Sequence, residues 1–141
     1  MTEQPKVEYY NLSAGFAFPS QTYKLDSSIV SLYLEAVKES NDLYRNEELV
    51  PPMAVTAFAM SALSQAVSMP PGTIHVSQEL DFVNLVRTGD TITCHSKVSR
   101  KVDRGGLHLM NIDITVFNQN EEKVLTGRVG FVLPEPGKGD Q

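Results

Sequence analysis

A chain of 141 residues is long enough to bury the core of one domain and too short for two. Hydrophobic residues make up 41% and charged residues 21%, which is the balance of an ordinary globular protein. The formal net charge of −5 argues against nucleic acid as a partner, because phosphate binding needs a basic patch.

The two ends of the chain are predicted to lie outside the folded unit. Residues 1–12 are assigned to an N-terminal extension, and the Pro- and Gly-rich residues 135–141 to a disordered tail. No long linker divides residues 13–134, so they are predicted to form one domain. The chain starts without the basic and apolar regions of a signal peptide, and Cys94 is its only cysteine. We therefore expect a cytoplasmic protein.

The first elements are a strand and an amphipathic helix. A strand is predicted around residues 16–24. A helix is predicted over residues 27–39, with Asp26 as its N-cap and a run of apolar residues at helical spacing on one face. A short irregular segment then leads to the longest apolar stretch of the chain.

Residues 49–78 contain no Asp, Glu, Lys or Arg, and they include a second predicted helix from about residue 52 to 69. Prolines 51 and 52 stand at its start, where proline is tolerated, and the sequence Pro-Pro-Gly at 70–72 ends it. Apolar residues occupy almost its whole circumference, which predicts a helix buried on nearly all sides. Its apolar part of seventeen residues, interrupted by serines and a glutamine, is shorter than the roughly 20 residues of a membrane span.

Four strands are predicted after this helix, because apolar residues alternate with polar ones in each segment. In the first of them, Ile74, Val76, Leu80 and Phe82 are expected to share one face. Short turns rich in Gly, Asn and Asp separate the strands, so they are predicted to form antiparallel hairpins. An all-apolar helix and about five such strands predict an α+β fold in which a curved sheet wraps around the helix. The predicted strands cover residues 73–82, 91–102, 108–117 and 124–133.

The order of these segments resembles the MaoC-like hydratase/dehydratase family. Four segments carry the resemblance. They are the end of the first predicted helix with the E-S-N-D-L-Y at residues 39–44, the V-P-P-M at 50–53, the H-V-S-Q-E-L-D-F at 75–82 and the R-T-G-D-T at 87–91. It covers roughly residues 13–134. It implies a single hotdog fold, in which a curved antiparallel sheet wraps around one long buried helix.

The family resemblance also implies a chemistry. These enzymes add water to trans-2-enoyl thioesters, or remove it from (3R)-hydroxyacyl thioesters, with a carboxylate and an imidazole that hold the water. Their motif is D-x-N-P-x-H, and residues 39–44 place Glu39, Asn41 and Tyr44 at its Asp, Asn and His positions. Tyrosine, with a pKa of about 10, is a poor base near pH 7. An alternative alignment that starts the motif at Asp42 puts Glu47 at the His position but does not match the Asn and Pro of the motif.

Each motif residue also has an ordinary structural interpretation. Glu39 is a solvated charge at a helix end, Asn41 caps a turn, and Tyr44 is a half-buried packing residue. The three histidines are 20 and 13 residues apart, which fits no metal motif, and no cofactor is expected. The residues expected to bind substrate, as the walls of an apolar tunnel and its surroundings, are Pro52, Met53, Ala54, His75 and Phe82.

Two hypotheses for function remain. The chain is either a non-catalytic or weakly active subunit of a hydratase/dehydratase, or a self-sufficient R-specific enoyl-thioester hydratase using Glu39, Asn41 and Tyr44. Hotdog thioesterases are disfavoured because the long helix has no acid. The expected partners are an acyl-CoA or acyl-carrier-protein thioester and a second hotdog chain. An open sheet edge predicts edge-to-edge pairing, either as a homodimer or as a heterodimer with a catalytic MaoC-like chain.

Overall fold

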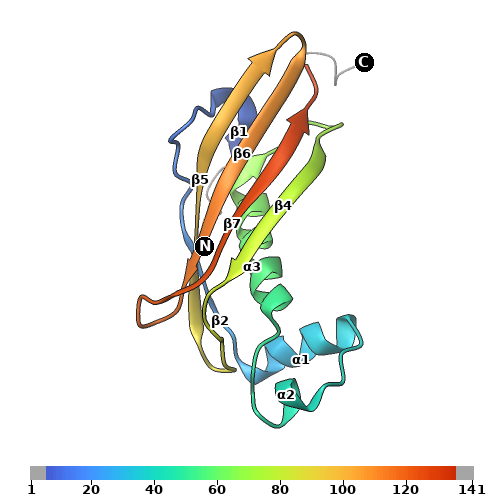
Figure 1. Ribbon diagram of the computed structural model, residues 1–141, viewed down its shortest axis with the longest axis vertical. Coiled ribbons are helices and arrows are strands. Elements are labelled where there is room, and N and C mark those ends of the chain that lie inside the picture. Colours follow the sequence, from blue (N-terminus) through green and yellow to red (C-terminus); the bar gives the residue numbers. More distant parts are fainter. Residues whose placement is uncertain (1–5, 136–141) are drawn as a thin grey trace.

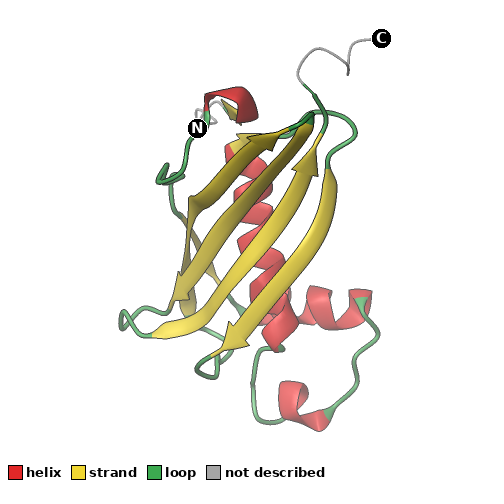
Figure 2. Ribbon diagram, turned by 45° about the horizontal axis from the view of Figure 1, so that its top comes forward, coloured by secondary structure: helices red, strands yellow, loops and turns green. Residues whose placement is uncertain are grey.

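The computed structural model describes residues 6–135. Its centre is a five-stranded sheet with one long helix, α3 (Pro52–Ala66), against its concave face (Figures 1 and 2). All neighbouring strands of this sheet are antiparallel, as predicted. In spatial order the strands are β2 (Gln21–Lys24), β5 (Thr91–Arg104), β6 (Leu107–Phe117), β7 (Lys123–Leu133) and β4 (Ile74–Phe82).

The predicted alternation of the late strands is confirmed by their burial. On β6, Met110, Ile112, Ile114 and Val116 are buried, while the residues between them are partly exposed. Successive side chains of a strand point to opposite faces, so these four residues lie on the face that packs against α3. β5 and β6 are joined by a two-residue turn, Gly105-Gly106, in which both residues have positive φ (56° and 80°). Glycine adopts this conformation without strain, which suits a tight hairpin.

The prediction that α3 is buried on nearly all sides is wrong. Ala54, Ala59 and Ala62 are buried against the sheet, whereas the opposite side of the helix is exposed. The reason is that the sheet curls around only one side of α3 in the described residues 6–135. We call the exposed side the outer face of α3, and it consists of Met53, Ala57, Ser61 and Ser64.

The helix also ends three residues before the predicted position 69. Residues Val67–Ser68 form β3, which pairs in parallel with β1 (Val7–Glu8) near the start of the described chain. A 3₁₀ turn, η1 (Tyr9–Asn11), follows β1. The buried Leu12 comes next, and Lys101 Nζ donates to its carbonyl at 3.0 Å. Residues 6–12, the described part of the expected extension, therefore pack on the domain.

Two short helices lie at the end of the molecule where α3 begins (Figure 1). They are α1 (Ser27–Ala36) and α2 (Asp42–Arg45), of which only α1 was predicted. The Asp26 cap is confirmed, because its carboxylate accepts a hydrogen bond from the Ile29 backbone at 3.0 Å. None of the helices in the described part of the chain is long and apolar enough to cross a membrane.

A β-bulge in β4 changes which of its side chains share a face. His75 pairs with Phe131 of β7, and Ser77 pairs with the adjacent Gly130. Val76 therefore has no partner of its own on β7 and is the extra residue of the bulge. Because of this shift, His75 pairs with the buried Phe131, and the two rings lie 5.0 Å apart between centroids. The prediction that Ile74 and Val76 share a face with Phe82 is therefore wrong for Ile74, because His75 takes that position.

The packing of α3 on the sheet predicts the effect of a buried charge. Ala59 is 3% exposed, so Ala59→Lys is expected to unfold the domain, because an unpaired buried ammonium costs several kcal/mol, comparable with a whole domain's stability of about 5–15 kcal/mol. The control is Ala36→Lys, which makes the same change at an exposed helical position. Thermal unfolding followed by circular dichroism compares the two. A folded Ala59→Lys variant with an unchanged melting temperature would contradict the packing.

Candidate functional site

The segment that follows α1 contains the predicted motif residues, and its polar side chains bond to its own backbone. The Glu39 carboxylate accepts a hydrogen bond from the backbone N–H of Asn41 at 3.0 Å. The Asn41 side-chain oxygen in turn accepts from the backbone N–H of Leu43 at 3.0 Å, which makes Asn41 the N-cap of α2. In this chain Glu39 therefore stabilises a turn, and Asn41 caps a helix.

The path of the chain explains this arrangement. Lys38 has a left-handed backbone with φ of 57°, and the Glu39 N–H donates to the carbonyl of Leu34 at 2.9 Å. This is a common way to end an α-helix, and it stops α1 at Ala36 rather than at the predicted residue 39. Glu39 thus lies in the turn between two helices and is half-buried.

Tyr44 lies on α2 and packs, half-buried, against the edge of the core. It lines a cleft of about 360 Å³ between α1 and α2. No hydrogen bond to its hydroxyl is present within residues 6–135. The other residues that line this cleft are Ser27, Val30, Ser31, Leu34, Glu35, Arg45, Glu48 and Thr88.

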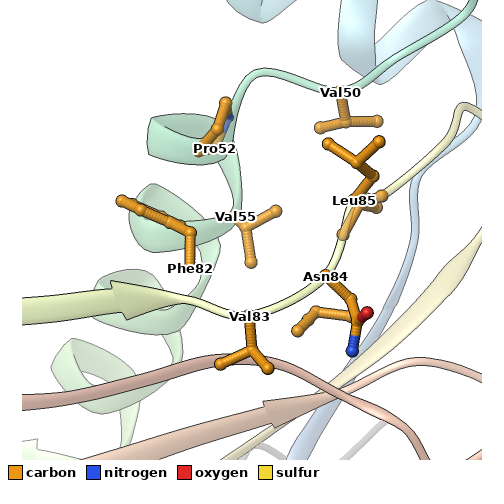
Figure 3. A pocket seen from close by; sticks show the side chains of 9 residues that line it. Val50, Pro52, Val55, Phe82, Val83, Asn84 and Leu85 are labelled. Carbon is orange, nitrogen blue, oxygen red and sulfur yellow. The ribbon is translucent and has the colours of Figure 1, made fainter.

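A second, more apolar pocket lies at the start of α3 and has a volume of about 160 Å³. Pro52 and Val55 come from the helix and Phe82 from the end of β4, and Figure 3 shows Val50 and Leu85 on its other side. Valine, proline, leucine and phenylalanine side chains form its walls, together with the amide of Asn84. The remaining lining residues are Val83, Val86 and Val124.

The structure brings only two of the predicted substrate-binding residues together in this pocket, Pro52 and Phe82. Met53 lies on the outer face of α3 and is 48% exposed, whereas Ala54 is buried in the core. His75 lies at the opposite end of β4, where its ring Nε2 is 3.0 Å from the carbonyl of Ser77. None of the motif residues lines the apolar pocket. Tyr44 lines the cleft between α1 and α2, whereas Glu39 and Asn41 line neither cleft, so the structure does not gather the predicted site in one place.

Sequence reasoning missed the loop after β4. Val83 and Leu85 are 52% and 69% exposed and form an apolar surface beside Phe82, which is the kind of surface that often serves as an interaction site in other proteins. The signal was present as an apolar run over residues 82–86 that does not alternate as a strand does. Val50 joins this loop to the start of α3, because its N–H donates to the Val86 carbonyl at 2.8 Å.

Two further reactive side chains, Cys94 and Tyr23, have pKa values that burial raises. Burial raises the pKa of the Cys94 thiol to about 12, so it stays protonated at neutral pH and is a poor nucleophile. Burial also raises the pKa of the Tyr23 phenol, an effect that the neighbouring Ser61 partly offsets. Among residues 6–135, no three His, Cys, Asp or Glu side chains gather in a way that could hold a metal ion.

Comparison with known proteins identifies the family. Residues 13–127 match the family described as FAS1-like, dehydratase domain region. This match covers more than half of the chain. The chain belongs to the FAS1-like dehydratase-region family. No curated protein sequence matches this family member significantly.

Solved structures show the same fold as this FAS1-like dehydratase-region chain. The R-hydratase PhaJ1 from Pseudomonas aeruginosa is 21% identical with a TM-score of 0.77, over 90% of this chain and 85% of that one. The MaoC-like dehydratase from Rhodospirillum rubrum is 18% identical with a TM-score of 0.69, over 91% and 97%. The HadBC (3R-hydroxyacyl-ACP dehydratase) complex from Mycobacterium tuberculosis contains a chain that is 16% identical with a TM-score of 0.66, over 84% and 96%. The predicted hotdog fold is confirmed.

The capping role of Asn41 predicts a specific pattern of stability. Asn41→Ala is expected to lower the free energy of unfolding by about 1 kcal/mol, because α2 loses its N-cap. Asn41→Asp keeps an oxygen acceptor and is the matched control, expected to unfold like the wild type. Chemical denaturation measures both. If Asn41→Ala instead left stability unchanged and abolished binding of crotonyl thioester, Asn41 would be a ligand contact rather than a cap.

Proposed function

We propose that this chain is a non-catalytic or weakly active subunit of a hotdog dehydratase/hydratase for (3R)-hydroxyacyl and trans-2-enoyl thioesters. One observation carries the proposal: at the motif positions, Glu39 and Asn41 bond to the backbone, and Tyr44 replaces the imidazole. Hydration of an enoyl thioester needs a group that moves a proton near neutral pH. A carboxylate held in a turn is poorly suited to share a water with a phenol that has no hydrogen-bonded neighbour among residues 6–135.

The apolar pocket supports a role in binding the acyl chain. Its walls are mostly hydrocarbon, and burial of apolar surface favours a fatty-acyl group there. The pocket opens at the first turn of α3, which has no side-chain cap. The partial positive charge of a helix N-terminus favours the thioester carbonyl at this end, with the hydrocarbon between Pro52 and Phe82. The carrier of the acyl group is coenzyme A or an acyl carrier protein.

The free edge of the sheet supports pairing with another chain. β4 is one of the two edge strands of the sheet, the other being the short β2, and eight of the nine residues of β4 are exposed. Exposed edges are usually covered, because their unpaired backbone N–H and C=O groups can otherwise form hydrogen bonds with strands of other chains. We infer that a second hotdog chain pairs with β4 and that this brings it near the outer face of α3. The partner is a second copy or a catalytic MaoC-like chain, and the HadBC complex is an assembly of related fold.

The same proposal includes location. The chain has one cysteine, which is buried and unpaired, so nothing in its cysteine content requires an oxidising compartment. This supports a cytoplasmic location, where thioester intermediates of acyl metabolism could reach the protein. Localisation of the tagged chain by cell fractionation tests this part of the proposal.

The replaced imidazole predicts the activity of the purified chain. The wild type is expected to hydrate crotonyl thioester little or not at all, and Glu39→Gln is expected to leave this rate nearly unchanged. Tyr44→His restores a side chain that titrates near neutral pH. A gain in rate would show that only the imidazole is missing, whereas no gain in a folded variant would show that the separation of position 44 from the apolar pocket also prevents the reaction. Tyr44→Phe is the control for loss of the hydroxyl. Robust turnover by the wild type that falls on the order of 10²-fold in Glu39→Gln would instead establish a self-sufficient hydratase.

The pocket predicts where acyl thioester binding fails. Leu85→Asp places a carboxylate in the apolar wall and is expected to weaken binding of crotonyl thioester by at least about tenfold, because desolvating a charge is costly. Leu32→Asp is the matched control: Leu32 is 66% exposed, close to the 69% of Leu85, but lies on α1. Isothermal titration calorimetry measures both variants. Equal binding by the two would show that the acyl chain does not enter this pocket.

A further inference from the structure

A row of alternating charges crosses the sheet on the face turned away from α3. Lys97 on β5 pairs with Asp113 on β6, Asp113 with Arg128 on β7, and Arg128 with Glu79 on β4. Arg128 Nε donates to the Asp113 carboxylate at 2.8 Å. Opposite charges placed directly across neighbouring strands stabilise a sheet, and here the signs alternate over four strands. We call these four residues the charge row.

The charge row ends on the free edge with a negative charge. Glu79 has no strand on its far side, and its neighbour in the row, Arg128, is already bonded to Asp113. Asp81, two residues along β4, lies on the same face because side chains alternate, and it pairs with the uncharged Thr126. Both carboxylates are exposed. The edge of the sheet therefore presents two acids in succession.

A second copy of this chain is a poor match for such an edge. Residues Ile74–Phe82 contain no Lys or Arg, and His75 is their only basic side chain. Antiparallel pairing of two β4 strands would bring together two carboxylates from each, four in all, along one seam. Like charges across neighbouring strands destabilise pairing, and the bulge at Val76 disturbs the register in which His75 would approach an acid.

We infer that β4 pairs with a non-identical chain whose edge strand carries Lys or Arg opposite Glu79 and Asp81. Such a residue would continue the charge row by one more alternation. The inference rests on the proposed function, because it takes the pairing of β4 from there and adds the charge of the partner. The negative charge of β4 thus favours the heterodimer over the homodimer.

A charge-swapped copy of the chain serves as the probe for this surface. Wild type, the double variant Glu79→Lys/Asp81→Lys and an equimolar mixture are compared by analytical ultracentrifugation at low salt. The mixture is expected to associate at least about tenfold more tightly than the wild type alone, because opposite charges then face each other across the seam. The difference is expected to shrink at about 0.5 M salt, which screens exposed charges.

Two further variants make the result specific. Glu121→Lys/Glu122→Lys makes the same charge change in the exposed turn before β7, and its mixture with the wild type is expected to gain nothing. Glu79→Gln/Asp81→Asn removes all four carboxylates from the seam between two copies and is expected to self-associate more tightly than the wild type. Circular dichroism checks that each variant is folded.

The inference is overturned if the wild type self-associates as tightly as the mixture, or if no combination associates. Binding of crotonyl thioester to the same proteins is measured separately and tests the proposed function. Normal thioester binding without any charge preference would therefore remove this inference and leave the binding function standing.

Discussion

The close packing of α3 on the concave face of the sheet is the contact on which the rest of the structure depends. The helix turns three small residues, Ala54, Ala59 and Ala62, toward the sheet, and short side chains allow the backbone of a helix to approach closely. The sheet contributes long apolar side chains such as Met110 and Ile112, which are fully buried. Burial of apolar area at roughly 25 cal/mol per Å² makes this layer the main source of stability.

The same contact leaves three regions open. A single helix covers only part of a five-stranded sheet, so the edge strand β4 and the outer face of α3 stay exposed. The start of α3 also stands clear of the sheet, and there Val50, Phe82 and Leu85 enclose the apolar pocket. The proposed binding of an acyl chain and the proposed pairing with a partner therefore both involve surface that the core does not occupy.

The residues at the motif positions have structural roles in this fold. Glu39 and Asn41 fix the turn between α1 and α2, and this role needs only oxygen acceptors close to backbone N–H groups. Once Tyr44 stands at the position of the imidazole, the segment has no obvious proton carrier but still closes the end of the molecule.

The sequence alone determined the elements whose signal is local. Alternation along residues 108–117 reflects one strand with one buried face, Asp26 caps the helix that starts beside it, and prolines 51 and 52 mark the start of α3. These features depend on residues a few positions apart, so propensity and periodicity are enough to find them.

Only the tertiary structure decided the features that depend on distant residues. The bulge at Val76 follows from the register against β7, and it puts His75 rather than Ile74 beside Phe131. The exposed side of α3 could not be read from its composition, because an apolar helix surface looks the same whether this chain or another covers it. The separation of Tyr44 from the pocket around Phe82 was equally hidden. Sequence patterns give the face and length of each element, whereas register, coverage and the meeting of side chains are set by packing between elements.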